Sequence, residues 1–249
     1  MTTDELIYQL EGNRMRVPLT DVVLDKLVSL LLSGQLKTGD TLPSESELAR
    51  SFNVSKPIVR LALRQLAAMG VVDIRQGKPS VVRELDSRPL ELYLQLAVSS
   101  LDGGLEDAVE LRRALETRAA ALAAARRSDE DVERLEAVLR TMASVRMEHD
   151  EWIAADIEFH AIIARASGNS LIKFLNQALH STMRYVIGTL HARKDMRNAD
   201  ETVARHREIV DAIRRRDVAA AQRAMSEHFD KSVPIAAQIQ KETRKATKG

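Results

Sequence analysis

Four side chains in the C-terminal half of the chain have the types and spacing of metal ligands. Asp156 and His160 are four residues apart, so on a helix both would project from one face. His206 and His228 follow further along the chain, each within a helical pattern. One carboxylate and three imidazoles without a thiol suit zinc, nickel, manganese or iron. The spacing by itself leaves open both a metal site and an ordinary surface pair.

A second group of side chains could bind a polyanion. Residues 50–83 contain seven basic residues and one acidic residue, a net charge of +6. Lys56, Arg60 and Arg64 recur every four residues and would share one helix face, narrow enough to enter a DNA major groove of about 12 Å. Cations at this spacing can also form a face that is only solvated. Whether the face binds DNA must therefore be judged from the secondary structure predicted around it.

Those elements form a recognisable sequence of two short helices and two strands. Ser44 and Glu47 are spaced as a capping box that opens one helix, and Ser55 with Pro57 can open the next. Apolar residues at helical spacing give the second helix a core face. Residues 71–74 and 80–82 are predicted to be strands on either side of a glycine-containing turn. The apolar set is Val59, Ala62, Leu63, Leu66 and Met69. The pattern predicts a winged helix-turn-helix, preceded by a helix that starts after Thr20.

After a polar linker at residues 84–89 the pattern is helical throughout. The chain is therefore expected to be mainly α, with a winged helix-turn-helix (α+β) followed by an all-α helical bundle, for which the resemblance to a known family given below implies a ligand-binding domain. Seven helices are expected, near residues 90–100, 104–126, 129–147, 150–167, 169–192, 199–215 and 217–240. The expected organisation is a flexible arm at 1–17, a DNA-binding domain at 18–85, an all-α domain at 86–240, and a basic tail at 241–249. The resemblance given below implies that residues 86–240 are an effector-binding and dimerisation domain.

Composition narrows the possible environments. The 249 residues include no cysteine, which excludes disulfides and thiolate zinc sites and fits a reducing cytoplasm. No apolar run approaches the roughly 20 residues that span a bilayer, and the acidic N-terminus does not look like a signal peptide. Aromatic residues make up only 3%, which disfavours a stacking platform for single strands. A cytoplasmic protein without membrane partners is expected.

Residues 18–84 resemble the GntR family of bacterial transcription regulators. The resemblance rests on Gly39, the run Leu42-Pro43-Ser44-Glu45, Leu48-Ala49, Val54-Ser55, Val59-Arg60, Leu63, Leu66, Gly70 and the Gly77 wing. By position it implies DNA contacts from Ser55, Lys56, Pro57 and Arg60 on the recognition helix and from Gln76 and Gly77 on the wing. Arg64, Lys78 and Ser46 complete the candidate set. Relatives often carry arginine in place of Ser46, and serine cannot make the bidentate guanine contact of arginine.

Residues 88–235 resemble the all-helical ligand domain of the fatty-acid-regulator subfamily. The similarity lies in residues 110–116, 156–160 and 167–169 and in the segments around His206 and His228. Many members bind a metal through one Asp and three His, the last two 22 residues apart, as His206 and His228 are. The resemblance therefore implies a metal site of Asp156, His160, His206 and His228. Zinc is the first expectation, with nickel, manganese or iron as alternatives, and an acyl-CoA ligand is disfavoured.

The resemblance also makes Arg112 the candidate for binding an effector, since a guanidinium can bind a carboxylate with two parallel hydrogen bonds. A structural salt bridge is the alternative role of Arg112, and Asn169 is expected to cap its helix rather than touch a ligand.

These observations favour a ligand-responsive transcription regulator rather than an enzyme. The expected form is a homodimer on a palindromic operator, with repression relieved by a small carboxylate effector such as a sugar acid or hydroxy acid. One alternative is a metal-dependent hydrolase or lyase fused to a DNA-binding module, although no separate general base is spaced to the site. Another is a regulator whose helical domain only dimerises around a structural metal.

Overall fold

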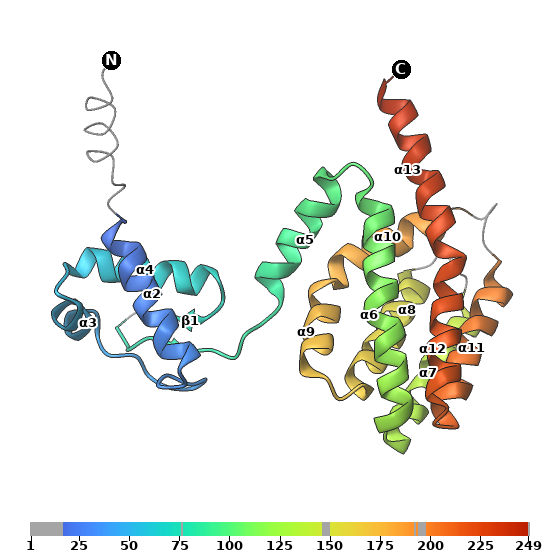
Figure 1. Ribbon diagram of the computed structural model, residues 1–249, viewed down its shortest axis with the longest axis horizontal. Coiled ribbons are helices and arrows are strands. Elements are labelled where there is room, and N and C mark those ends of the chain that lie inside the picture. Colours follow the sequence, from blue (N-terminus) through green and yellow to red (C-terminus); the bar gives the residue numbers. More distant parts are fainter. Residues whose placement is uncertain (1–16, 76, 146–149, 192, 194–197, 249) are drawn as a thin grey trace, which may run out of the picture. The chain divides into compact units, whose positions relative to one another are not determined.

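The computed structural model describes residues 17–75, 77–145, 150–191, 193 and 198–248. It divides into two compact units, Met1–Pro89 and Leu90–Gly249 (Figure 1). Residues 1–16 of the expected N-terminal arm lie outside the described residues. None of the helices in the described part of the chain combines the length and apolar composition required to cross a bilayer.

The N-terminal unit is a winged helix-turn-helix. Its helices pack around a small apolar core, and its two strands pair antiparallel with Val72 opposite Val82. Thr41 adds a single bridge to Val81, which ties the segment before the helix pair to the wing. The elements are α2 (Leu19–Leu32), α3 (Glu45–Phe52), α4 (Lys56–Ala68), β1 (Val72–Asp73) and β2 (Val81–Val82).

Local sequence explains how the two helices of the motif begin and end. The capping box is confirmed: Ser44 Oγ accepts from the Glu47 amide, and the Glu47 carboxylate accepts from the Ser44 amide. Asn53 then ends α3 in the left-handed region, with φ of 54°. Ser55 is the N-cap residue of α4 with Pro57 in the first turn, as expected, although the Ser55 hydroxyl makes no capping hydrogen bond. The expectation that Met69 faces the core was wrong, because Met69 follows the last residue of α4 and is 45% exposed.

The C-terminal unit is an all-α bundle. Helix α6 packs against α8, α11, α12 and α13 and so connects these four helices into one bundle (Figure 1). The helices of this unit within the described residues are α5 (Arg88–Ser100), α6 (Gly104–Arg126), α7 (Asp129–Ser144), α8 (Asp150–Ala166), α9 (Ser170–Ala178), α10 (His180–His191), α11 (Ala199–Arg214), α12 (Val218–Asp230) and α13 (Ser232–Lys248).

Two of the expected helices are each divided into two. The helix expected at 217–240 ends at Asp230 and restarts at Ser232, because Pro234 lacks an amide proton and fits only the first turn of a new helix. The helix expected at 169–192 is interrupted at Leu179, and no residue there explains the break. The basic tail expected at 241–249 is not separate, since α13 continues to Lys248.

Candidate functional site

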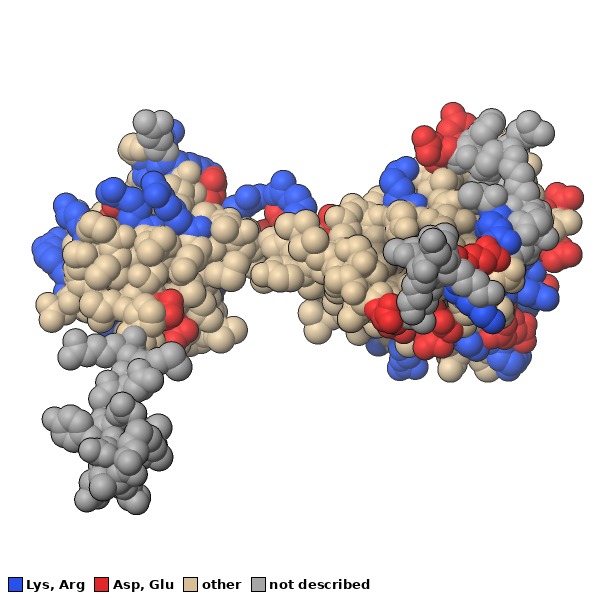
Figure 2. All heavy atoms as spheres, turned by 90° about the horizontal axis from the view of Figure 1, so that it is seen from above, with Lys and Arg blue, Asp and Glu red and all other residues tan. Residues whose placement is uncertain are grey.

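The recognition helix α4 presents its cations to solvent. Lys56, Arg60 and Arg64 are exposed, as are Ser55 and Pro57 at the start of the helix, whereas the apolar residues on the other face are buried. Figure 2 shows groups of lysine and arginine side chains on the N-terminal unit with fewer acidic side chains, while the C-terminal unit carries many side chains of both signs. The face expected to read DNA is thus open and basic.

Arg60 has a partner that the sequence analysis did not find. Its Nε and Nη2 donate hydrogen bonds to the Glu45 carboxylate at 2.7 to 3.1 Å. These hydrogen bonds lower the pKa of Glu45. Glu45 is the first residue of α3, so the ion pair links the two helices of the motif. It fixes the edge of the guanidinium formed by Nε and Nη2, and Nη1 takes no part in this ion pair.

The other candidate DNA contacts lie at the edges of this face. Ser46 is half-buried in the first turn of α3, and Lys78 on the wing is exposed. Gly77 has φ of 69°, which favours glycine, and a Cβ there would meet no atom within 4 Å. The open space allows close approach of the wing backbone to a phosphate. Gln76 lies outside the described residues.

The bundle brings the candidate metal ligands together from three helices. Asp156 and His160 come from α8, His206 from α11 and His228 from α12, and each is at most 4% exposed. One ring nitrogen from each histidine lies within 4.8 Å of the others. The Nε2 of His206 is 3.1 Å from Asp156 Oδ1. Residues separated by up to 72 positions in the chain therefore face a single point.

The hydrogen bonds of His206 fix which of its nitrogens carries a proton. Its Nδ1 lies 2.7 Å from the backbone carbonyl of Thr202, and a carbonyl only accepts, so Nδ1 is the donor. In the tautomer with a single proton on Nδ1, the lone pair of Nε2 points toward the anionic oxygen of Asp156. Two lone pairs at this distance require a proton or a metal cation between them.

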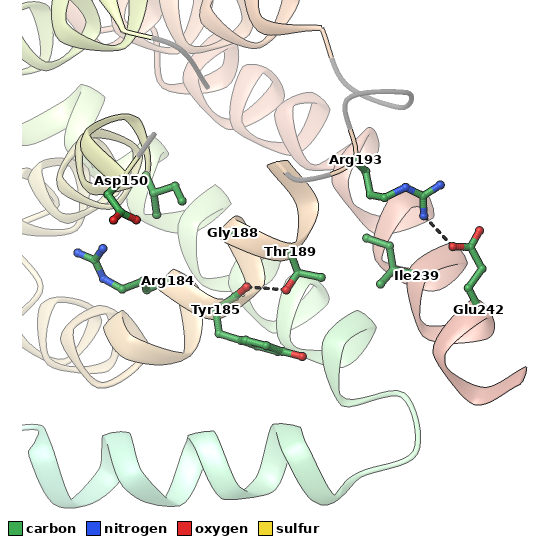
Figure 3. Close-up of a pocket in the computed structure, with 9 residues that line it drawn as sticks. Asp150, Arg184, Tyr185, Gly188, Thr189, Arg193, Ile239 and Glu242 are labelled. Carbon is green, nitrogen blue, oxygen red and sulfur yellow. Dashed lines mark hydrogen bonds and ion pairs between the residues drawn. The ribbon is translucent and has the colours of Figure 1, made fainter. Parts of the chain in front are cut away.

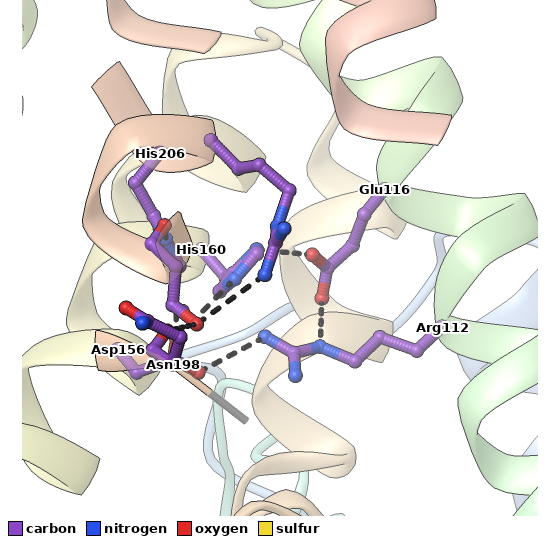
Figure 4. Close-up of polar contacts among 8 residues, drawn as sticks. Arg112, Glu116, Asp156, His160, Asn198 and His206 are labelled. Carbon is purple, nitrogen blue, oxygen red and sulfur yellow. Dashed lines mark hydrogen bonds and ion pairs between the residues drawn. The ribbon is translucent and has the colours of Figure 1, made fainter. Parts of the chain in front are cut away.

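Glu116 and Arg112 of α6 complete the buried polar cluster (Figure 4). Arg112 Nε lies 2.6 Å from Glu116 Oε1, and Arg112 Nη2 lies 3.7 Å from Asp156 Oδ2. The second Glu116 oxygen contacts His160 Nδ1. This contact orients the His160 ring so that Nε2, which has no hydrogen-bond partner, faces the cluster. Sequence reasoning missed Glu116, although its position four residues after Arg112 was a visible signal.

Burial and neighbouring charges set the protonation states of the cluster. Burial, followed by His206 and His160, holds the pKa of His228 well below its usual value. Burial and then Arg112 lower the pKa of His160. Burial alone would raise the pKa of Asp156, but the close contact with His206 and the nearby Arg112 guanidinium outweigh it and hold the pKa of this carboxyl well below its usual value. Neutral imidazole and ionised carboxylate are the forms that bind metals.

Other residues of the helical unit do not join this cluster. His180 is exposed, and His149 lies outside the described residues. Asn169 caps α9 through Oδ1, as expected. An open hollow of about 660 Å³ lies between α10, α13 and the start of α8 (Figure 3), and none of its lining residues belongs to the cluster. It is therefore not taken as the effector site.

Comparisons with known proteins identify both units. Residues 19–82 match the bacterial regulatory proteins of the gntR family, and residues 107–231 match the FCD domain. The chain belongs to the GntR family. The FCD domain corresponds to the helical C-terminal domain of the fatty-acid-regulator subfamily, so the expected fold and family are confirmed.

Individual GntR relatives are similar in sequence to this protein along most of the chain. An uncharacterised transcriptional regulator of Bacillus subtilis, YcbG, is 34% identical, covering 86% of this chain and 88% of the relative. The transcriptional repressor NanR of Cronobacter sakazakii is 31% identical, covering 86% and 84%. A solved GntR structure from Streptococcus agalactiae superposes with a TM-score of 0.64 at 26% identity, covering 86% of this chain and 99% of that one.

This GntR protein is a DNA-binding transcription regulator with a ligand-binding FCD domain. The regulator interpretation is confirmed, and the alternative of a hydrolase or lyase is set aside because the similar proteins and both domains are those of regulators. The winged domain binds operator DNA.

Proposed function

We propose that this regulator is a homodimeric repressor whose helical domain holds a divalent metal and leaves its operator when a small carboxylate binds there. The observation that carries the proposal is the pairing of His206 with Asp156. The Nδ1 proton of His206 is committed to Thr202, and a metal cation held between Nε2 and Asp156, in place of a second ring proton, would account for their short approach.

The donor atoms fit a metal of the zinc class. Two ligands about 2.1 Å from one ion at tetrahedral or octahedral angles are about 3.0 to 3.4 Å apart, which matches the 3.1 Å between His206 and Asp156. The unpartnered His160 Nε2 and His228 Nδ1 are buried nitrogens that need a partner. The nitrogens of the three histidines spread up to 4.8 Å, so modest ring movements would complete the site.

Zinc is the first candidate, followed by nickel, manganese and iron, because nitrogen donors with a single carboxylate suit all four. When bound, the ion supplies a positive centre to which a carboxylate can attach. The chain's own residues exclude water and orient the ligands. The ring of Phe159 lies 4.8 Å from that of His206, and the ring of Phe229 lies 5.0 Å from that of His228.

Arg112 is proposed as the second contact of the effector. Glu116 occupies Nε, and the guanidinium lies over the Phe229 ring at 5.3 Å, so its orientation is fixed. Its terminal nitrogens face the side of the cluster where Asp156 lies. A small acid such as a hydroxy acid or sugar acid would pair one carboxylate oxygen with the metal and the other with Arg112. The alternative is a purely structural metal with Arg112 only as a salt-bridge partner.

The proposal of a dimeric repressor is based on the DNA-binding unit and on the relatives. A single small winged domain has modest specificity, and two related by a two-fold axis would read a palindrome with fixed half-site spacing. NanR, a relative over most of the chain, is named a repressor. Effector coupling to DNA of about 1–3 kcal/mol would give a five- to 150-fold change in affinity.

The test combines a ligand screen with a DNA-binding assay. Purified full chain is screened by thermal shift against organic acids, with and without a chelator, and positive acids are added to a complex with the DNA upstream of its own coding region. The proposal expects an acid that raises Tm only when metal is present and that releases DNA. Acids that stabilise equally with chelator would contradict it, and a metal that stabilises without any acid effect would favour the structural alternative.

A further inference from the structure

A second cavity lies in the helical unit, away from the buried histidines. Its volume is about 470 Å³, within the usual range for small-molecule sites. Its walls come from α5, α10, α13 and the start of α6. It adjoins the hollow of Figure 3 and shares with it Tyr185 and Thr189 of α10 and Ile239 of α13. None of its lining residues belongs to the Asp156 and histidine cluster.

The lining has the chemistry of a site for an uncharged molecule. No Asp, Glu, Lys, Arg or His lines it among the described residues, in contrast to the neighbouring hollow, which contains Arg184 and Glu242. Its apolar side includes Val98, Leu101 and Leu105. Hydrogen-bonding groups come from serine, threonine and glutamine side chains.

One of these groups lacks a partner. Thr182 lines the cavity at 2% exposure, and its Oγ1 is buried without a hydrogen bond. An unpaired buried hydroxyl costs about 1–3 kcal/mol, so a ligand group within reach of Thr182 would be favoured. A second polar side chain, Gln240, is already occupied by accepting from the Leu105 amide.

The helix that closes the cavity is weakly packed. No residue of α5 is buried, and Leu92, Tyr93 and Leu96 are 57 to 73% exposed. A polar link from α5 to the bundle is made by the Glu91 carboxylate, which accepts a hydrogen bond from the Ser181 amide at 2.9 Å. At its far end α5 passes so close to Gly104 that a Cβ there would collide with the Val98 backbone. A molecule between α5 and α10 would therefore add packing that α5 lacks.

We infer that this cavity is a second ligand site of the regulator, for a small uncharged molecule that is mainly apolar and carries one hydrogen-bonding group. The occupant packs against Val98 and Leu101, pairs with Thr182, and holds α5 on the bundle. Because α5 begins where the DNA-binding unit ends, at Arg88, the site lies beside the segment that joins the two functions. It is independent of the metal and of any carboxylate.

The experiment uses metal-loaded full chain and N-phenyl-1-naphthylamine, an uncharged aromatic amine whose fluorescence rises in apolar surroundings. Saturable binding is expected, with an affinity lowered at least about tenfold in Ser99→Trp, whose new ring would fill the cavity. Ser100→Trp is the matched control, because Ser100 is the next residue on α5, is equally exposed and does not line the cavity. Its affinity should equal that of the unchanged chain.

Two further measurements keep the inference testable if Ser99→Trp fails to fold. Thr182→Val keeps the shape of the side chain and should weaken binding about fivefold by removing the hydroxyl. Saturating probe should slow amide exchange in α5 without affecting α7.

Absence of saturable binding, or equal loss in Ser99→Trp and Ser100→Trp, would overturn the site. Loss of probe binding in His206→Ala would place the probe in the histidine cluster and also overturn it. Probe binding that dissociates a dimer, seen by light scattering, would assign the cavity to a subunit interface instead. A failure of the metal proposal can be told apart from a failure of this second site, because the metal proposal is tested by the metal content of the protein and not by probe binding.

Discussion

His206 Nε2 lies 3.1 Å from Asp156 Oδ1 although the two residues are 50 positions apart and lie on different helices. The other nitrogen of His206 is committed to the Thr202 carbonyl. This relationship joins α8 to α11 at a point that also includes α12 through His228. A ligand bound there would contact residues of three helices at once, so the proposed effector would act directly on the packing of the domain.

Glu116→Gln should weaken metal binding about 10- to 100-fold, the range typical of groups that orient metal ligands. The amide keeps the shape of the carboxylate but loses the charge that orients His160 and holds Arg112. Competition with a chromogenic chelator measures the affinity. Glu110→Gln, an exposed change on the same helix, is the control and should bind metal normally. Equal affinities in the two variants would mean that Glu116 does not support the site.

Without metal, the protein should lose stability as the pH falls below about 6.5, the ordinary pKa of histidine. The folded-state pKa of His228 and of His160 is lowered, so the unfolded chain binds protons that the folded chain does not. The unfolded state is thus favoured as the pH falls from about 6.5 toward the folded-state values. The lowered pKa of Asp156 adds a further loss at lower pH.

Thermal melts of the chelated protein across pH 5 to 8 measure this effect. His228→Gln removes one of the two histidines with a lowered pKa and should flatten the dependence of Tm on pH in this range. A slope unchanged by the substitution would show that His228 does not contribute.

Arg60→Ala should weaken operator binding by about 1–3 kcal/mol if the guanidinium contacts a base. Because the Glu45 pair fixes Arg60 at two nitrogens, Arg60→Lys should restore little of the loss. Fluorescence anisotropy with labelled operator gives the affinities, and Arg134→Ala on α7 is a control that also removes an exposed, paired arginine. Full recovery by lysine would reduce the role of Arg60 to that of a charge near phosphate.

The sequence predicted the DNA-binding unit well because its signals are local. Ser44 with Glu47, and the four-residue spacing of Lys56, Arg60 and Arg64, specify helix starts and faces within a few residues. The ion pair of Arg60 with Glu45 was not predicted, because it joins two helices whose relative placement depends on the turn between them. Residue periodicity says nothing about the geometry of that turn.

The helical unit was predictable in class but not in every element. Its helices read clearly from periodicity, yet Leu179 interrupts one of them without a breaker. The four candidate metal ligands were predicted from a family resemblance rather than from residue spacing. Asp156 is too far in the sequence from His206 and His228 for any local pattern to link them. Arg112 and Glu116 were close enough in sequence to suggest a pair, but their contacts with Asp156 and His160 depend on the packing of α6 against α8.

The metal content of purified protein tests the central claim most directly. After exposure to excess zinc and gel filtration, inductively coupled plasma mass spectrometry should find one ion per chain in the unchanged protein and in His180→Ala, an exposed histidine outside the cluster. His206→Ala should retain close to none while keeping its helical circular dichroism and most of its operator affinity. Full metal occupancy in folded His206→Ala would contradict the assignment of the site.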